Sequence, residues 1–379
     1  MKHFFFFVFC TFVACLPTGV FAKNYESTDT MLDAQVSVTQ TSYYKGKVID
    51  IVEEIPKNDF DMFEQTVHIQ LLDGDEKGRE ISVPYEITPE QAINKKLKKG
   101  DTVILNTLPG ENPLTYYINE IYRLPTLGWL LGFFMMIAFG IARRRALQAM
   151  FGLVLSFGVI VWFVLPRILA GDSPVLISLI GSTAIMSISI YLAHGVRTRT
   201  TIAFLCSIGT AAIGIGFATI AVHAMSLFGM GSEEAFYLQF SVDTVINLRG
   251  LLLGGIIIGM LGVLDDVTTT QAATVEEIHL ANSFLSRKEL YRRGASVGRE
   301  HITSLINTLV LAYTGAALPL LLLFQIYDTP LWVTLNSEIV MEEVVRMIVG
   351  SVVLILAVPI TTYIAAWWYG RADTKFVPK

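Results

Sequence analysis

The sequence predicts an α-helical membrane protein with about seven transmembrane helices, preceded by a small all-β domain outside the membrane. Hydrophobic residues make up 53% of the 379 residues and charged residues only 16%. The mean hydropathy of +0.55 is too high for a soluble chain of this length. Long apolar stretches recur from residue 124 onward, whereas residues 23–123 alternate polar and apolar positions in short runs.

The first 22 residues are typical of a signal peptide. One lysine precedes a short apolar run, and a Pro-Thr-Gly break is followed by small residues that signal peptidase accepts. We expect cleavage near Ala22; an uncleaved anchor is the alternative, and either form places residue 23 outside. Two of the three cysteines lie in this segment, so the mature chain is expected to have no disulfide framework and no thiolate metal site.

Residues 23–123 are expected to form a small β-barrel or β-sandwich. This segment holds 11 Lys and Arg against 18 Asp and Glu, a net charge of −7. Five runs alternate as strands do, and LLDGDEKGRE is typical of a hairpin turn. A segment of about 100 residues can bury its own core. The five runs are KGKVIDIV, QTVHIQLL, REISVPYEI, DTVILNTL and TYYINEIY.

Seven stretches in residues 124–379 are long enough to cross a bilayer, which needs about 20 apolar residues per helix. Cytoplasmic loops collect Lys and Arg, and this rule is met at every loop except at Arg167 if residue 123 is outside. We therefore expect a multi-pass protein of the bacterial cytoplasmic membrane, with residues 23–123 outside and the C-terminus in the cytoplasm. The predicted spans lie near 125–142, 146–166, 174–194, 201–225, 245–264, 303–326 and 345–368.

Two adjacent carboxylates, Asp265 and Asp266, mark the expected cytoplasmic end of the fifth span. If the helix continues, Thr269 and Glu276 share the face of Asp265, while Thr270 lies on the face of Asp266. Carboxylates and hydroxyls without a nearby lysine can hold a proton or a hard cation. The alternative is a helix boundary at which Asp and Thr are caps.

The residues after the aspartates favour a break in the helix. The run 267–270 is β-branched and therefore a poor helix former. Transporters place ion-coupling sites at discontinuous helices of this kind. Here too the alternative is a helix boundary.

Arg249 lies about one turn inside the fifth span, on its outer side. An unpaired arginine at span depth costs at least about 2.5 kcal/mol on insertion scales. Asp265 is 16 residues further on, about 24 Å along a helix, and cannot be its partner. We expect either an ion pair with an outer-side acid or a contact with an anion or substrate in an external vestibule. The candidate acids are Asp243, Glu338, Glu342 and Glu343.

Several function classes lack their sequence signals. Intramembrane aspartyl proteases carry Gly-x-Gly-Asp, but the matching stretch 262–265 lacks the second glycine. No P-loop, HExxH, GxSxG or dinucleotide fingerprint is present. The net charge of −5 and the scattered basic residues argue against a nucleic-acid partner. No cofactor is expected apart from a cation at Asp265 and Asp266.

Three runs in the membrane part are distinctive: LRGLLLGGIIIGMLGVLDDVTTTQAATVEEI, ELYRRGASVGREHITSLINTLVLAYTGAALPLLLLF and VGSVVLILAVPITT. Together they resemble the YibE/F-like family of bacterial multi-span membrane proteins over roughly residues 120–368, and the N-terminal layout is similar too. The family is one of uncharacterised function, often regarded as transporters, so the resemblance implies no residue roles. Its distinctive motif positions are matched by Asp265, Asp266, Gln271, Arg292, Arg293, Arg299 and His301.

Three functions remain open. We favour a secondary transporter of unknown substrate, coupled to H⁺ or a cation through Asp265 and Asp266. The second is an assembly, sensory or scaffold protein whose external β-domain recognises another protein, while the spans only anchor it in the membrane. The third is a metal-dependent enzyme acting on a lipid-linked substrate. In the transporter, His301 is the candidate proton-linked group on the cytoplasmic side, near the basic residues Arg292, Arg293 and Arg299.

Overall fold

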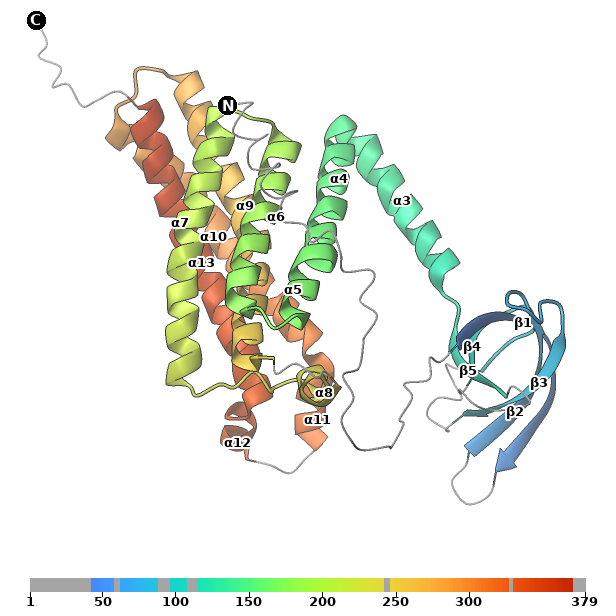
Figure 1. Ribbon diagram of the computed structural model, residues 1–379. Helices are drawn as coiled ribbons and strands as arrows, with labels where there is room; N and C mark the ends of the chain where they lie inside the picture. Colours follow the sequence, from blue (N-terminus) through green and yellow to red (C-terminus); the bar gives the residue numbers. More distant parts are fainter. Residues whose placement is uncertain are drawn as a thin grey trace, which may run out of the picture. The chain divides into compact units, whose positions relative to one another are not determined.

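A computed structural model describes residues 42–57, 62–87, 96–107, 115–241, 246–326 and 330–370 (Figure 1). The chain divides into two compact units, one made of residues 22–141 and the other mainly of residues 142–379. The first unit contains the β-domain and helix α3, and the second contains the remaining helices. The predicted signal peptide lies outside the described residues.

The N-terminal unit contains a five-stranded antiparallel half-barrel with strand order β3-β2-β1-β4-β5. All five predicted strands are confirmed, as is the hairpin turn between β2 and β3. The long central strand β1 pairs with both β2 and β4, and two register shifts in its ladder with β2 bend it. The strands are β1 (Ser42–Lys57), β2 (Met62–Leu71), β3 (Glu80–Ile87), β4 (Thr102–Thr107) and β5 (Tyr116–Ile121).

Alternating apolar residues form the core of the half-barrel, including Val67, Ile69 and Leu105, which are fully buried. Tyr116 in β5 packs at the edge of this core and donates a hydrogen bond to Oε2 of Glu76 in the β2–β3 turn at 2.9 Å. Burial, together with this hydrogen bond and the charge of the carboxylate, raises the pKa of Tyr116 to about 12. The small domain therefore has an apolar core of its own.

Six helices in the described part of the chain are long and apolar enough to cross a membrane, and the bent pair α10 and α11 would make a seventh. This number agrees with the prediction of about seven spans and establishes the class of a polytopic membrane protein. The helices are α3 (Leu124–Ala142), α4 (Arg144–Val159), the π-helical turn η1 (Ile160–Val164), α5 (Leu165–Leu169), α6 (Pro174–His194), α7 (Thr198–Ala224), α8 (Glu233–Ser241), α9 (Leu248–Ala281), α10 (Arg287–Ala316), α11 (Leu318–Ile326), α12 (Leu331–Leu335) and α13 (Glu338–Tyr369).

Local signals in the sequence explain where several helices begin and bend. The Asn247 side chain caps α9 by accepting a hydrogen bond from the Gly250 amide at 3.0 Å. Ser286 caps α10 through the Glu289 amide. Helices α10 and α11 meet at an angle of 57°, with Pro319 at the second position of α11, where its missing N–H is tolerated.

Helix α9 lies at the centre of the second unit, where it packs against α6, α7, α10 and α13 (Figure 1). Small residues allow close approach: an added Cβ at Gly254 would lie 2.5 Å from Oγ of Ser178 in α6. A Cβ at Gly214 in α7 would lie 2.3 Å from Cγ2 of Val353 in α13. The core of the bundle therefore forms around α9.

The predicted break after the aspartates is wrong, because α9 continues as one helix through 267–270 to Ala281. Val267 and Thr268 are buried against neighbouring helices. The Thr268 hydroxyl donates to the Leu264 carbonyl at 2.8 Å and lies 2.7 Å from Oγ of Ser207 in α7. Tertiary packing, including the contact between Thr268 and Ser207, outweighs the weak helix propensity of the β-branched residues.

Candidate functional site

A cavity of about 690 Å³ lies among α4, α6, α7, α9 and α10. Helix α9 supplies most of its polar lining, because the helix stays continuous and presents one face along the cavity. The structure thus brings together the predicted candidates Asp265, Asp266, Thr269 and Thr270. The α9 lining comprises three carboxylates and three hydroxyls, those of Asp265, Asp266, Glu277, Thr269, Thr270 and Thr274.

The two oxygens of Asp265 have different surroundings. Oδ2 accepts a hydrogen bond from Oγ of Ser189 in α6. Oδ1 is buried and has no hydrogen-bond partner among the described residues. A buried acceptor without a partner costs about 1–3 kcal/mol, and more when it is charged. This oxygen is therefore where a proton, a cation or a water molecule would be most stabilising.

Asp266 is more exposed than Asp265, and it lines the same cavity. The Thr269 hydroxyl donates to the carbonyls of Asp265 and Asp266, at 2.7 and 3.2 Å. Its oxygen keeps lone pairs that can accept or coordinate. The site thus combines carboxylate and hydroxyl oxygens, the ligands that hard cations prefer.

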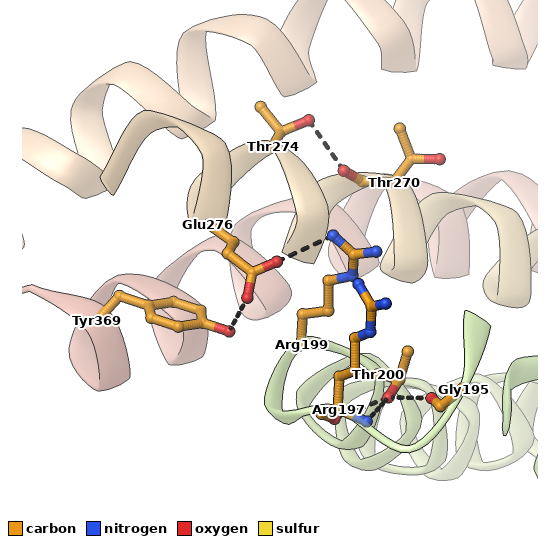
Figure 2. Close-up of polar contacts among 8 residues, drawn as sticks. All are labelled: Gly195, Arg197, Arg199, Thr200, Thr270, Thr274, Glu276 and Tyr369. Carbon is orange, nitrogen blue, oxygen red and sulfur yellow. Dashed lines mark hydrogen bonds and ion pairs between the residues drawn. The ribbon is translucent and has the colours of Figure 1, made fainter. Parts of the chain in front are cut away.

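A tight turn between α6 and α7 places basic groups at the edge of the cavity. Gly195 adopts a positive φ of 75°, and the Thr200 hydroxyl donates to its carbonyl at 2.8 Å (Figure 2). The same hydroxyl accepts from the Arg197 amide at 2.8 Å, which closes the turn. His194 and Arg199, on either side of the turn, line the cavity and bring basic side chains to an otherwise acidic site.

Glu276, a predicted ion-binding candidate, does not line the cavity itself. Its Oε2 lies 3.0 Å from Nη1 of Arg199 in α7, and its Oε1 accepts a hydrogen bond from the Tyr369 hydroxyl of α13 at 3.0 Å (Figure 2). Both partners of the ion pair are mostly buried. Glu276 therefore links three helices, while its neighbour Glu277 faces the cavity.

Gln271 is buried and also joins helices instead of lining the cavity. Its Nε2 donates to the Gly294 carbonyl of α10 at 2.9 Å and to Oγ1 of Thr362 in α13 at 2.7 Å. Gly298 makes room for this side chain, since an added Cβ would lie 2.8 Å from Oε1 of Gln271. These contacts make Gln271 a buried link between α9, α10 and α13.

The candidates on α10 do not line the cavity, to which this helix contributes Val297. Arg292 and Arg293 both bind Oε1 of Glu289, at 2.8 and 3.0 Å, on the exposed face of the helix. Arg299 is exposed and His301 is half-buried.

Arg249 lies in the first turn of α9, far from the aspartates. Its Nε donates to the Leu227 carbonyl at 2.8 Å, and its guanidinium carbon lies 5.0 Å from the centre of the Phe228 ring. Both contacting groups belong to the loop between α7 and α8, and neither group carries a negative charge.

The predicted pairing of Arg249 with three acids of α13 is wrong, because each acid has another partner. Oε1 of Glu338 accepts from the amides of residues 228–230, and Oε1 of Glu342 accepts from the Gly231 amide at 3.0 Å. Glu343 pairs with Arg346. The fourth predicted acid, Asp243, lies outside the described residues.

Sequence reasoning identified the acidic face of α9 but missed the groups that other helices contribute. Ser189, His194 and Arg199 reach the cavity from α6 and α7. Nothing in the spacing of one sequence links these positions to Asp265, since they lie more than 60 residues away from it. Among the described residues, no group of three or more His, Cys, Asp or Glu side chains is placed to hold a metal ion.

The half-barrel, the helical bundle and the acidic cavity define a polytopic integral membrane protein with a small β-domain at its N-terminal side. Two family models match the chain: YibE/F-like protein over residues 130–371, and the YibE/F family N-terminal domain over residues 36–121. The chain belongs to the YibE/F family. No curated protein and no solved structure matches it.

Proposed function

We propose that this protein is a secondary transporter coupled to H⁺ or a cation through Asp265 and Asp266. The observation that carries the proposal is the buried, unpartnered Oδ1 of Asp265 at a cavity. Intramembrane carboxylates with such surroundings are the groups that proton and ion relays use.

The chemistry of the cavity supports coupling of an ion to a larger substrate. Binding a proton or cation removes negative charge from a site where two adjacent carboxylates repel each other. The volume of about 690 Å³ is far larger than one ion needs, and lies within the range of sites for small organic molecules. An ion at Asp265 therefore leaves room for a substrate that contacts Thr270 and Glu277.

The charge distribution supports an orientation with the cavity toward the cytoplasm of a bacterial cell. Arg197 and Arg199, and the basic run that starts at Arg287, lie at the helix ends next to the cavity. Glu233 and Glu338 lie at the opposite helix ends. Because cytoplasmic ends collect basic residues, the β-domain is assigned to the outside and the C-terminus to the cytoplasm.

Proteoliposomes containing a pH-sensitive dye test the coupling. We expect a mixture of small organic solutes added on one side to drive H⁺, Na⁺, K⁺ or Li⁺ across the membrane when the wild-type protein is present, with the dye reporting H⁺ flux, and Asp265→Asn to slow this ion flux at least tenfold. Glu300→Gln is the matched control, since it removes an exposed carboxylate on α10 that does not line the cavity. Equal rates for wild type and Asp265→Asn would contradict coupling through this residue.

A second candidate function, recognition of a protein partner by the β-domain, is favoured by one surface feature. Tyr43 of β1, Asn106 of β4 and Tyr117 of β5 are cross-strand neighbours. The two tyrosines are 62% and 40% exposed, so aromatic side chains stand on the outer face of the sheet. Tyrosine is enriched in protein interfaces. Loss of a crosslinked partner in the double variant Tyr43→Ser/Tyr117→Ser, with the fold retained, would support this function.

A further inference from the structure

We propose that a second cavity, at the other end of α9, binds the anionic group of a ligand, either a carboxylate or a phosphate. The cavity has a volume of about 580 Å³ and is lined by Arg249 together with the polar residues His223, Gln239 and Asn247. Arg249 lies about 24 Å along the helix from Asp265. The inference goes beyond the proposed transport function, because it is based on different residues and a different cavity.

The loop between α7 and α8 fixes the position of the guanidinium group. Gly229 has a φ of +83°, and an added Cβ would lie 2.2 Å from the carbonyl oxygen of Leu248. The loop therefore passes directly over the start of α9, which brings the Leu227 carbonyl and the Phe228 ring to Arg249. A hydrogen bond to Nε and a ring against the guanidinium plane hold the side chain in one orientation.

Among the described residues, no group occupies the terminal nitrogens of Arg249, which leaves them available for a ligand. Arginine has five N–H donors, and the Leu227 carbonyl uses the one on Nε. The two terminal nitrogens form a planar fork that matches two oxygens of a carboxylate or phosphate. Within the described ranges, Arg249 forms no ion pair, and Glu338 and Glu342 bind the amides of the same loop.

The other walls of the cavity complement an anion attached to a small organic or lipid body. Asn247 uses Oδ1 to cap α9, which leaves its amide nitrogen as a donor. The His223 ring is held by a hydrogen bond from its Nδ1 to the Thr219 carbonyl at 2.8 Å. Val175 and Leu253 add apolar surface. A fixed guanidinium and the Asn247 amide as donors, beside apolar side chains, form the kind of site that orients an amphiphilic anion.

Thermal unfolding of the full-length protein in a non-ionic detergent tests the proposal. Inorganic phosphate and acetate are titrated against chloride at constant ionic strength, and lipid nanodiscs with phosphatidylglycerol are compared with nanodiscs of phosphatidylcholine. A wild-type melting temperature that rises with either soluble anion identifies a free anionic ligand. A rise in phosphatidylglycerol nanodiscs alone identifies a lipid headgroup.

Variants show whether the effect arises at Arg249. We expect Arg249→Gln to reduce the apparent affinity for the stabilising anion at least tenfold, and Arg249→Lys to give an intermediate loss, because lysine keeps the charge without the fork. Arg167→Gln is the control, since it removes an exposed arginine that pairs with Asp172 outside this cavity. No stabilisation of the wild type by any of these anions, or stabilisation that Arg249→Gln retains in full, would overturn the proposal.

Discussion

Asp265 and Asp266 are adjacent in the chain but have different surroundings. Asp265 is held by Ser189 and keeps one buried, unpartnered oxygen, whereas Asp266 is more exposed. In the proposed transporter, we therefore expect Asp265 to be the main ion-binding residue. Asp266 adds negative charge at the same cavity, which strengthens the attraction for a cation.

Ser189→Ala tests the support of Asp265. Removing the hydroxyl leaves Oδ2 without the hydrogen bond that the structure shows, so we expect a loss of about 1–3 kcal/mol in the free energy of unfolding. Chemical denaturation in detergent measures this loss in the free energy of unfolding.

Ser187→Ala is the matched control on the same helix. The Ser187 hydroxyl donates to the Thr183 carbonyl of α6 itself, so its loss leaves no carboxylate oxygen unpaired. We expect Ser187→Ala to lower the free energy of unfolding less than Ser189→Ala does. A Ser187→Ala loss as large as that of Ser189→Ala would show that the hydrogen bond to Asp265 has no special weight.

At the scale of elements, α9 owes its continuity and central position to its neighbours. Gln271 joins it to α10 and α13, and Glu276 joins it to α7 and α13. A single sequence shows the β-branched run 267–270 but not the helices that pack around it. This is why local propensity predicted a break that tertiary contacts prevent.

Two glycines of α10 test this packing within one helix. A Cβ at Gly298 would lie 2.3 Å from Cγ1 of Val358 and 2.8 Å from Oε1 of Gln271, so Gly298→Ala must displace side chains of α13 and α9. We expect a loss of about 1–3 kcal/mol, as for overpacked cores. Thermal unfolding in detergent measures the change.

Gly315→Ala is the control, because an added Cβ there meets nothing within 4 Å. Alanine favours a helix by about 0.5–1 kcal/mol over glycine, so this variant should be neutral or slightly more stable. Equal destabilisation by both variants would contradict the close packing of α10 at Gly298.

At the scale of the whole molecule, the sequence predicted the membrane class, the number of strands and the approximate number of spans. Hydropathy and strand alternation are local properties, and they suffice for these features. The site was predicted only in part. Asp265, Asp266, Thr269 and Thr270 share one helix, whereas Ser189 and the neighbours of Arg249 come from other segments, and only the fold brings these together.

The proposed orientation predicts which surfaces a membrane-impermeant maleimide reaches in intact cells. Lys77→Cys, in the exposed β2–β3 turn, should react without cell permeabilisation. Lys288→Cys, exposed near the start of α10, should react after permeabilisation alone. Cys206 is buried and should give little background. The reverse labelling pattern would contradict the orientation and would place the acidic cavity outside.

The central claim is that the aspartates form an ion site, and the most direct test compares the melting temperature of the wild type with that of Asp265→Asn/Asp266→Asn. Both proteins are measured in detergent across pH and a panel of Na⁺, K⁺, Li⁺, Mg²⁺ and Ca²⁺. We predict that a cation, or protonation, stabilises the wild type and that this response disappears in the double variant. Equal, flat responses in both proteins would contradict an ion site and would leave the pair as polar residues that line a cavity.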